Sequence, residues 1–303
     1  MIKNWLRSIT PAFLLHWNRR RKKRNLNKVL ESQATEGASF TEDILVSELE
    51  KIGISKGDTI LVHSSLSKIG HLVNGPKTFV NALVTAVGLD GHILMPTSPN
   101  SSLQLDYIQN TKAFDVLNSK SKLGAITEYF RTLLGTVRSL HPTEPVSAYG
   151  KNAVHFVEGH FNALTPYQAN SPFAKVAAAK GKILYVGVTL DNAGTSLHTL
   201  EDAIVDFKYP VYHSDIFEMD IIDEHGTTHK VKTKVHNPQF SNLRQCDRLI
   251  PHFEQAGVLK QVKIGHAKTL LVDADGFFKT MLDLYHTKGI TMYTPNGEDL
   301  NID

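Results

Sequence analysis

Two polar side chains, His198 and Glu201, lie three residues apart in a segment with the pattern of a helix start. Residues at this spacing share one face of a helix, so Glu201 can accept a hydrogen bond from one ring nitrogen of His198. An imidazole held in this way keeps its second nitrogen for proton transfer and suits a general base. The alternative is a solvated pair on a helix surface, which the same spacing also produces.

Two further segments have residue types suited to binding anions. The first follows an expected strand and consists of His63, Ser64, Ser65 and Leu66. Open α/β sheets bind ligands at the ends of their strands, where hydroxyls and backbone N–H groups can hold an anion. The second is Arg138 with Ser139, before a turn fixed by proline, where a guanidinium suits phosphate. Ordinary turn chemistry and a solvated arginine are the alternatives.

Histidine is abundant, with 15 residues, but its spacing does not favour a metal site. His225 and His229 flank an expected turn without a third ligand nearby, and the His198–Glu201 segment lacks the two-histidine helix pattern of zinc hydrolases. The single cysteine, Cys246, excludes a disulfide framework and a thiolate cage, and we expect a buried, inert thiol. We therefore expect no metal, with a metal hydrolase as a remote alternative.

Helices and strands alternate along most of the chain, and these elements must position the candidate residues. Apolar residues at helical spacing predict helices over 41–52, 76–88, 124–133, 195–207, 248–257 and 277–285. Thr41 and Thr195 are the expected N-caps of the first and fourth. Strands are expected over 58–62, 92–95 and 182–188, and a long polar loop over 98–122.

Between 211 and 235 the apolar period changes to two on either side of Asp223-Glu224-His225-Gly226, which indicates a hairpin. Together with the strand–helix–strand order, this predicts an α/β fold. We expect a mostly parallel central sheet flanked by helices, with an inserted antiparallel hairpin region. Residues 36–303 are expected to form a single domain after a basic N-terminal arm over residues 1–35.

Charge is distributed unevenly between this arm and the body. Residues 1–30 hold nine of the 33 Lys and Arg residues and no acidic residue, which leaves 24 against 30 acidic residues and about −6 for the rest. An acidic body argues against nucleic-acid binding. The positive charge follows the apolar stretch of the arm, unlike a secretory signal, so we expect a cytoplasmic protein. An apolar stretch beside a basic run also suits peripheral contact with an anionic membrane, and a solvated or packed arm is the alternative.

Taken together, segments from about residue 41 to 285 resemble the aminoglycoside 3-N-acetyltransferase family. The segments that carry the resemblance, in order, are 57–66, 86–88, 94–97, 124–131, 137–142, 171–173, 184–188, 195–201 and 262–267. Their shared order and spacing matter more than any one motif. The resemblance implies the fold of that family, acetyl-CoA as donor, and an amino group on a sugar-like ring as acceptor.

The resemblance also implies a role for each candidate residue. His198 would take a proton from the attacking amine, with Glu201 orienting it. The residues expected to hold acetyl-CoA are His63, Ser64, Ser65, Leu66, Arg138, Ser139, Gly265, His266 and Ala267. Those expected on the acceptor side are Asp115, Asp191 and Asn192. Direct acyl transfer of this kind needs a positioned base and an anchored thioester, but no metal.

The chain departs from the family pattern on the acceptor side. Residues 143–148 differ from the family's usual segment after the His-Pro pair, and Lys120 and Lys122 add positive charge where a polycationic drug would need carboxylates. These departures fit a phosphate-bearing acceptor, such as a nucleotide- or lipid-linked amino sugar of surface polysaccharide synthesis. A non-catalytic CoA-binding or membrane-scaffold protein is a further alternative. The sequence does not indicate an oligomeric state.

Overall fold

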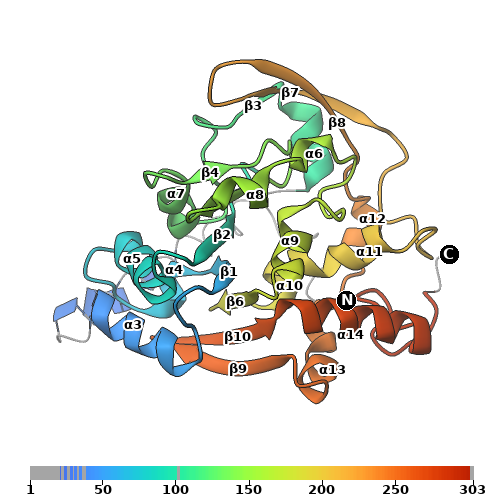
Figure 1. Ribbon diagram of the computed structural model, residues 1–303. Coiled ribbons are helices and arrows are strands. Elements are labelled where there is room, and N and C mark those ends of the chain that lie inside the picture. Colours follow the sequence, from blue (N-terminus) through green and yellow to red (C-terminus); the bar gives the residue numbers. More distant parts are fainter. Residues whose placement is uncertain are drawn as a thin grey trace.

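A seven-stranded sheet crosses the middle of the molecule, and a three-stranded sheet lies at one end of it (Figure 1). The computed structural model describes residues 39–100 and 103–300, preceded by residues 21, 24, 25, 28, 29, 31, 32, 34 and 35. The membrane contact expected of residues 1–30 therefore falls mostly outside the described residues and stays a prediction. Within the described part of the chain, no helix is long and apolar enough to cross a bilayer.

Three parallel strands form the centre of the large sheet: β1 (Thr59–Ser64) lies between β2 (His92–Pro96) and β6 (Lys182–Val186). Outside them the pairings are antiparallel. The outer strands are β5 (Val146–Tyr149) and β4 (Val137–Arg138) beyond β2, and β10 (Ala267–Asp273) and β9 (Leu259–Ile264) beyond β6. The expected α/β fold with a parallel strand core is confirmed, and its antiparallel edges are an addition to that expectation.

Alternating side chains give the large sheet two apolar faces, because successive strand residues point to opposite sides. Ile60 and Val62 of β1 belong to one core cluster, and Leu61 belongs to the other. The face with Ile60 is covered by α3 (Glu42–Lys51), α5 (Pro76–Val87) and α7 (Ala125–Arg131). The face with Leu61 is covered by α8 (Ala153–Val157), α9 (Pro172–Ala178), α11 (Thr199–Ala203), α13 (Ile250–Gln255) and α14 (Ala274–Lys288). In Figure 1, α3 and α5 lie to the left of the central strands, and α9, α11 and α14 lie to their right.

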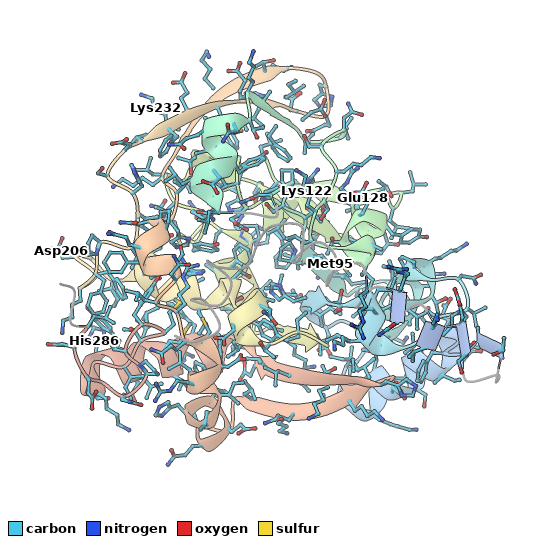
Figure 2. All side chains as sticks on the ribbon, turned by 180° about the vertical axis from the view of Figure 1, so that it is seen from behind. Met95, Lys122, Glu128, Asp206, Lys232 and His286 are labelled. Carbon is cyan, nitrogen blue, oxygen red and sulfur yellow. The ribbon has the colours of Figure 1, made fainter. Side chains whose placement is uncertain are left out.

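The expected hairpin is confirmed as β7 (Phe217–Ile222) and β8 (Thr228–Thr233). Lys232 on β8 is exposed at the end of the molecule, far from Met95 in the centre (Figure 2). The long loop expected over 98–122 is wrong, because it contains α6 (Gln104–Asn110) and β3 (Ala113–Asp115), which pairs with β7. Both elements bury their apolar residues against the hairpin, and that partner is distant in sequence.

The helix expected over 195–207 is shorter and begins differently. It consists of a 3₁₀ turn, η2 (Thr195–His198), followed directly by α11. Thr195 is not its N-cap, because its hydroxyl lies 3.3 Å from Nε2 of His63 instead. Thr41 does cap α3 as expected, accepting from the N–H of Ile44. The remaining short helices are α4 (Leu66–Ile69), η1 (His160–Asn162), α10 (Leu190–Ala193), α12 (Pro238–Ser241) and η3 (Cys246–Leu249).

Candidate active site

A cavity of about 400 Å³ opens at the carboxyl ends of the three parallel strands. Val62, His63 and Ser64 at the end of β1 line it, together with Pro96 at the end of β2 and Val188 just after β6. This is the edge at which open α/β sheets bind ligands, because the strand ends and the loops after them converge there. Several residues of this wall carry the chemistry considered below.

His198 lies in the cavity wall with its side chain 8% exposed. Its Nδ1 is 2.9 Å from Oε2 of Glu201, whose side chain is fully buried. Burial by itself would raise the pKa of Glu201, but His198 and His236 outweigh it and lower that pKa, so Glu201 is a carboxylate. Burial also lowers the pKa of His198 despite the opposing charge of Glu201. The neutral imidazole therefore donates from Nδ1 and keeps the lone pair on Nε2.

Two more side chains hold Glu201, and sequence reasoning missed both. Nε2 of His236 lies 3.0 Å from the same Oε2, and the hydroxyl of Tyr293 donates to Oε1. Burial, with smaller effects from His198 and Arg244, lowers the pKa of His236 to about 3, so this imidazole is neutral and donates. These residues lie 35 and 92 positions from Glu201 in the chain, so no local spacing could indicate them.

His198, Glu201 and His236 are also the one cluster of described residues with metal-ligand types, their candidate ligand atoms lying within 4.8 Å of one another. Both imidazoles contact the same carboxylate oxygen at hydrogen-bond distance. A metal would instead need lone pairs from all three groups to converge on one point about 2.0–2.2 Å away. Hydrogen bonds between the three groups account for their geometry. The ring of Tyr167 stacks on both imidazoles, with centroids 4.9 Å and 5.6 Å away, and fixes their orientation.

Four residues expected at the end of β1 divide into two groups. His63 and Ser64 line the cavity, whereas Ser65 and Leu66 start α4 outside its wall. His63 stacks on Tyr185 with the centroids 4.9 Å apart, and burial lowers the pKa of His63 to about 3. The hydroxyl of Ser64 is buried and has no hydrogen-bond partner among the described residues. An orphaned donor in a cavity wall is suited to a polar ligand group.

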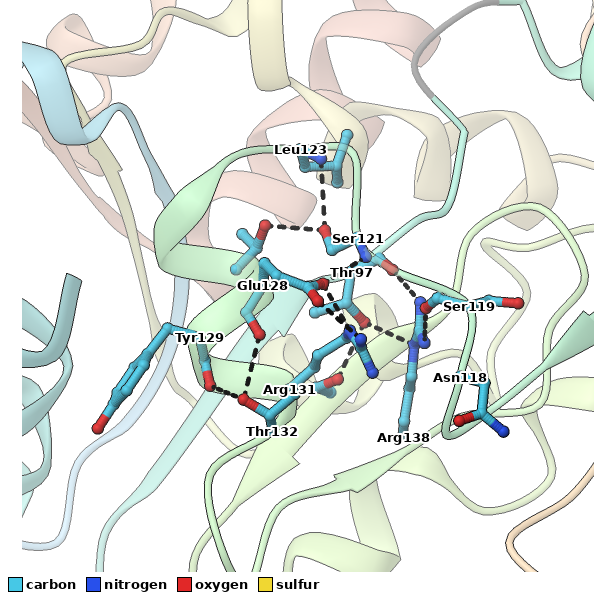
Figure 3. A network of polar contacts seen from close by, with 12 residues as sticks. Thr97, Asn118, Ser119, Ser121, Leu123, Glu128, Tyr129, Arg131, Thr132 and Arg138 are labelled. Carbon is cyan, nitrogen blue, oxygen red and sulfur yellow. Dashed lines mark hydrogen bonds and ion pairs between the residues drawn. The ribbon is translucent and has the colours of Figure 1, made fainter.

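The structure does not bring Arg138 and Ser139 to the cavity. Figure 3 shows the Arg138 side chain directed at Thr97 and Ser119. The guanidinium donates to the backbone oxygens of Val116, Ser119 and Thr97 and to the hydroxyl of Thr97. The Ser139 hydroxyl accepts from the N–H of Val146 at 2.9 Å. Their polar groups are therefore used within the protein, where they fix the loop before Lys120. The expected binding of CoA phosphates by Arg138 stays a prediction, and these internal hydrogen bonds do not favour it.

Four other residues that were expected to bind a substrate also lie outside the cavity wall. Gly265 and His266 form the turn between β9 and β10, and Ala267 is the first residue of β10; all three lie outside the cavity wall. Gly265 has φ +56°, and a Cβ there would lie 2.4 Å from the backbone oxygen of Ile69, so this position needs glycine for structural reasons. Asp115 accepts from the N–H groups of Leu117 and Asn118 and holds its own loop.

Asp191 and Asn192 lie in the cavity wall, and their expected contact with the acceptor stays a prediction. Cys246 lines the cavity as well, and burial raises the pKa of its thiol to about 12, which agrees with an inert cysteine.

Two ionisable wall residues, Glu144 and Arg244, were not expected. Burial raises the pKa of Glu144 to about 7, although a hydrogen bond of 2.8 Å from Nε2 of Gln104 opposes this. Nε of Arg244 lies 3.5 Å from the Tyr293 hydroxyl. Burial disfavours its charge, but Tyr293 and Glu201 outweigh burial and raise the pKa of Arg244. Glu144 could have been suspected from the sequence, because it falls in the segment 143–148 that departs from the family pattern. Nothing in the sequence around Arg244 indicated a role in the cavity.

Comparison with known proteins gives one consistent result. The family model for aminoglycoside 3-N-acetyltransferase matches residues 61–286. Aminoglycoside N(3)-acetyltransferase VIII of Streptomyces fradiae is 33% identical over 54% of this chain, and the match spans 62% of that relative. Aminoglycoside N(3)-acetyltransferase IX of Micromonospora chalcea is 24% identical over 83% of this chain and 95% of its own length.

Solved structures agree with these relatives. AAC-IIIb in its binary complex with CoASH has a TM-score of 0.67 at 26% identity, covering 82% of this chain and 96% of that chain. AAC-VIa bound to sisomicin has a TM-score of 0.67 at 27% identity, covering 81% and 97%. The fold and the acetyltransferase family expected from the sequence are thus confirmed. This chain belongs to the aminoglycoside 3-N-acetyltransferase family.

Proposed function

We propose that this protein transfers the acetyl group of acetyl-CoA to an amino group of an aminoglycoside or a related amino sugar, with His198 as the general base. The observation that carries the proposal is that His198, in the wall of the strand-end cavity, is paired with the fully buried carboxylate of Glu201. Membership of the family supports the reaction class. The relatives solved with CoASH and with sisomicin support the two kinds of substrate.

The protonation states around Glu201 suit the removal of a proton from an amine. A protonated amine has no lone pair, so its proton must leave before the nitrogen can attack the thioester carbonyl. The amine therefore enters the step as the free base, after its ammonium proton has gone to solvent. Nε2 of neutral His198 can accept the N–H proton that the nitrogen loses as the carbon–nitrogen bond forms, because Nδ1 already donates to Glu201. The carboxylate then stabilises the imidazolium that forms. When the carbon–sulfur bond breaks, the imidazolium can return the proton to the leaving thiolate, which balances the step.

The end of β1 has the groups that a thioester arm needs. His63 and Ser64 lie in the same wall as His198, and the buried hydroxyl of Ser64 lacks a partner among the described residues. A hydroxyl in this position can donate to a carbonyl of the bound arm. Asp191 and Asn192 lie in the wall after β6, where they can contact the acceptor. The position of each residue in the cavity wall is what supports its proposed contact with the thioester arm or the acceptor.

Replacing His198 tests the proposal. We expect His198→Ala to lower kcat on the order of 10²–10⁴-fold while leaving the Kd for CoA unchanged, since only proton transfer is lost. Thiol release from acetyl-CoA is measured with a panel of aminoglycosides and amino sugars, and CoA binding by calorimetry. His155→Ala is a matched control, because that histidine also faces a glutamate three residues on but is exposed. Near-normal turnover by His198→Ala would reject the base, and CoA binding without turnover of any amine would support the non-catalytic alternative.

A further inference from the structure

The cavity wall is not strongly acidic, although it lies in a family of enzymes named for polycationic drugs. Its carboxylates, among the described residues, are Glu144 and Asp191, and its one arginine is Arg244. Asp191 already accepts from the backbone N–H of Asp247 at 3.0 Å. Glu144 accepts from Gln104, and its pKa of about 7 leaves it partly protonated at neutral pH. A highly cationic acceptor would gain little attraction from such a wall.

Arg244 has an unused donor in this wall. Its Nη2 is buried and has no hydrogen-bond partner among the described residues. Its Nε is 3.5 Å from the Tyr293 hydroxyl, a long contact that leaves most of the guanidinium fork unused. A buried charged donor without a partner is costly, and a carboxylate or phosphate is the group whose geometry matches the fork.

The position of Arg244 relative to the base defines where an anion would bind. Arg244 contacts Tyr293, Tyr293 donates to Glu201, and Glu201 holds His198. The guanidinium and the imidazole therefore belong to the wall of one cavity and are linked by this chain of contacts.

We propose that Arg244 binds an anionic group of the acceptor, so that the preferred acceptor is an amino sugar carrying a carboxylate or a phosphate. This inference rests on the proposed function, because it assumes that the amine to be acetylated lies beside His198. Arg244 is then a specificity-determining residue. The side chain pairs with the acceptor's negative charge, and a neutral or polycationic acceptor leaves Nη2 without a partner.

Acceptor binding can be measured without turnover by using CoA in place of acetyl-CoA. The probes are glucosamine, glucosamine 6-phosphate and muramic acid, which share an amino sugar but differ in charge. We expect the protein with CoA to bind the two anionic sugars about 10- to 100-fold more tightly than glucosamine, as for a charged hydrogen bond. Arg244→Gln should abolish this preference and Arg244→Lys should keep part of it. Arg248→Gln is the matched control, since Arg248 is exposed and its guanidinium bonds to Gln245 and Asn296.

The phosphates of CoA are the other possible source of an anion at Arg244. We expect the Kd for CoA to be the same in Arg244→Gln and in the unmodified protein. A weaker Kd for CoA with an unchanged acceptor preference would overturn the proposal, because the anion would then belong to the cofactor. Equal binding of the three probes, or binding of none, would also overturn it. Failure of the proposed function would look different, because the protein would then acetylate none of the amines tested with acetyl-CoA, whatever their charge.

Discussion

Glu201 and Arg138 each lie at the centre of a network of polar side chains, but the two networks differ in what they leave open. Around Arg138, the donors go to backbone oxygens and to Thr97, and the neighbouring Arg131 pairs with both oxygens of Glu128 (Figure 3). Around Glu201, both carboxylate oxygens are also occupied. There, however, His198 in the cavity wall uses only Nδ1, and Nη2 of Arg244 lacks a partner among the described residues.

The difference distinguishes a buried polar cluster that only stabilises the fold from one that can also bind a ligand or exchange a proton. A network that satisfies all of its own donors and acceptors stabilises one arrangement of the chain and has nothing left for a ligand. A network with one unsatisfied atom facing a cavity can bind or exchange a proton there. By this criterion the Arg138 network stabilises the loop over 116–119, and the Glu201 network is the one that we propose as the reactive site.

After His198→Ala, the next largest effect is expected from Glu201→Gln, which removes the carboxylate at the centre of the Glu201 network. An amide side chain cannot fix the tautomer of His198 or balance an imidazolium charge, so kcat should fall on the order of 100-fold or more. Steady-state kinetics measures this, and the Kd for CoA should not change. If kcat stays within a fewfold of normal, the orienting role of Glu201 is wrong. Glu158→Gln is a matched control, because Glu158 forms an exposed pair with His155.

Arg138→Ala tests whether the Arg138 network only stabilises the fold. Removing the guanidinium leaves several oxygens without their donor, so the free energy of unfolding should fall by about 2–4 kcal/mol. Denaturant unfolding measures the loss, with the exposed Arg248→Ala as a control that should change little. The Kd for CoA should stay the same in folded protein. A large increase in that Kd without loss of stability would restore Arg138 to the cofactor site.

Acid should destabilise the fold through histidines in both regions. Burial lowers the pKa of His63 in the cavity wall to about 3 and that of His160, which contacts Ser139, to about 4. Below about pH 6.5 the unfolded chain binds protons that the native state does not, so stability is present above that pH and falls as pH drops. Each such histidine contributes about 1.4 kcal/mol per pH unit between its two pKa values. Unfolding curves from pH 7 to 5 measure the slope of the free energy of unfolding against pH. We expect His160→Asn to reduce this slope by the equivalent of one proton. An unchanged slope would show that His160 is protonated in the native state as well.

Local patterns were enough to predict much of the fold and part of the site. The central strands and the helix over 76–88 follow from apolar period and Gly or Pro boundaries, which act within a few residues. The pair of His198 and Glu201 followed from its spacing of three. The elements within 98–122 could not be recognised, because their apolar side chains are buried only against the hairpin over 217–233.

By itself the sequence determined the α/β class, the family and the pairing of His198 with Glu201, because these depend on order and spacing along the chain. Only the tertiary structure decided which polar groups converge. His236 and Arg244 reach the cavity wall from distant segments and Tyr293 reaches Glu201, whereas the Arg138 guanidinium donates to backbone oxygens outside the cavity. The physical reason is that a hydrogen bond depends on distance in space, and whether a charged side chain meets a ligand or a carbonyl depends on the packing of the whole chain.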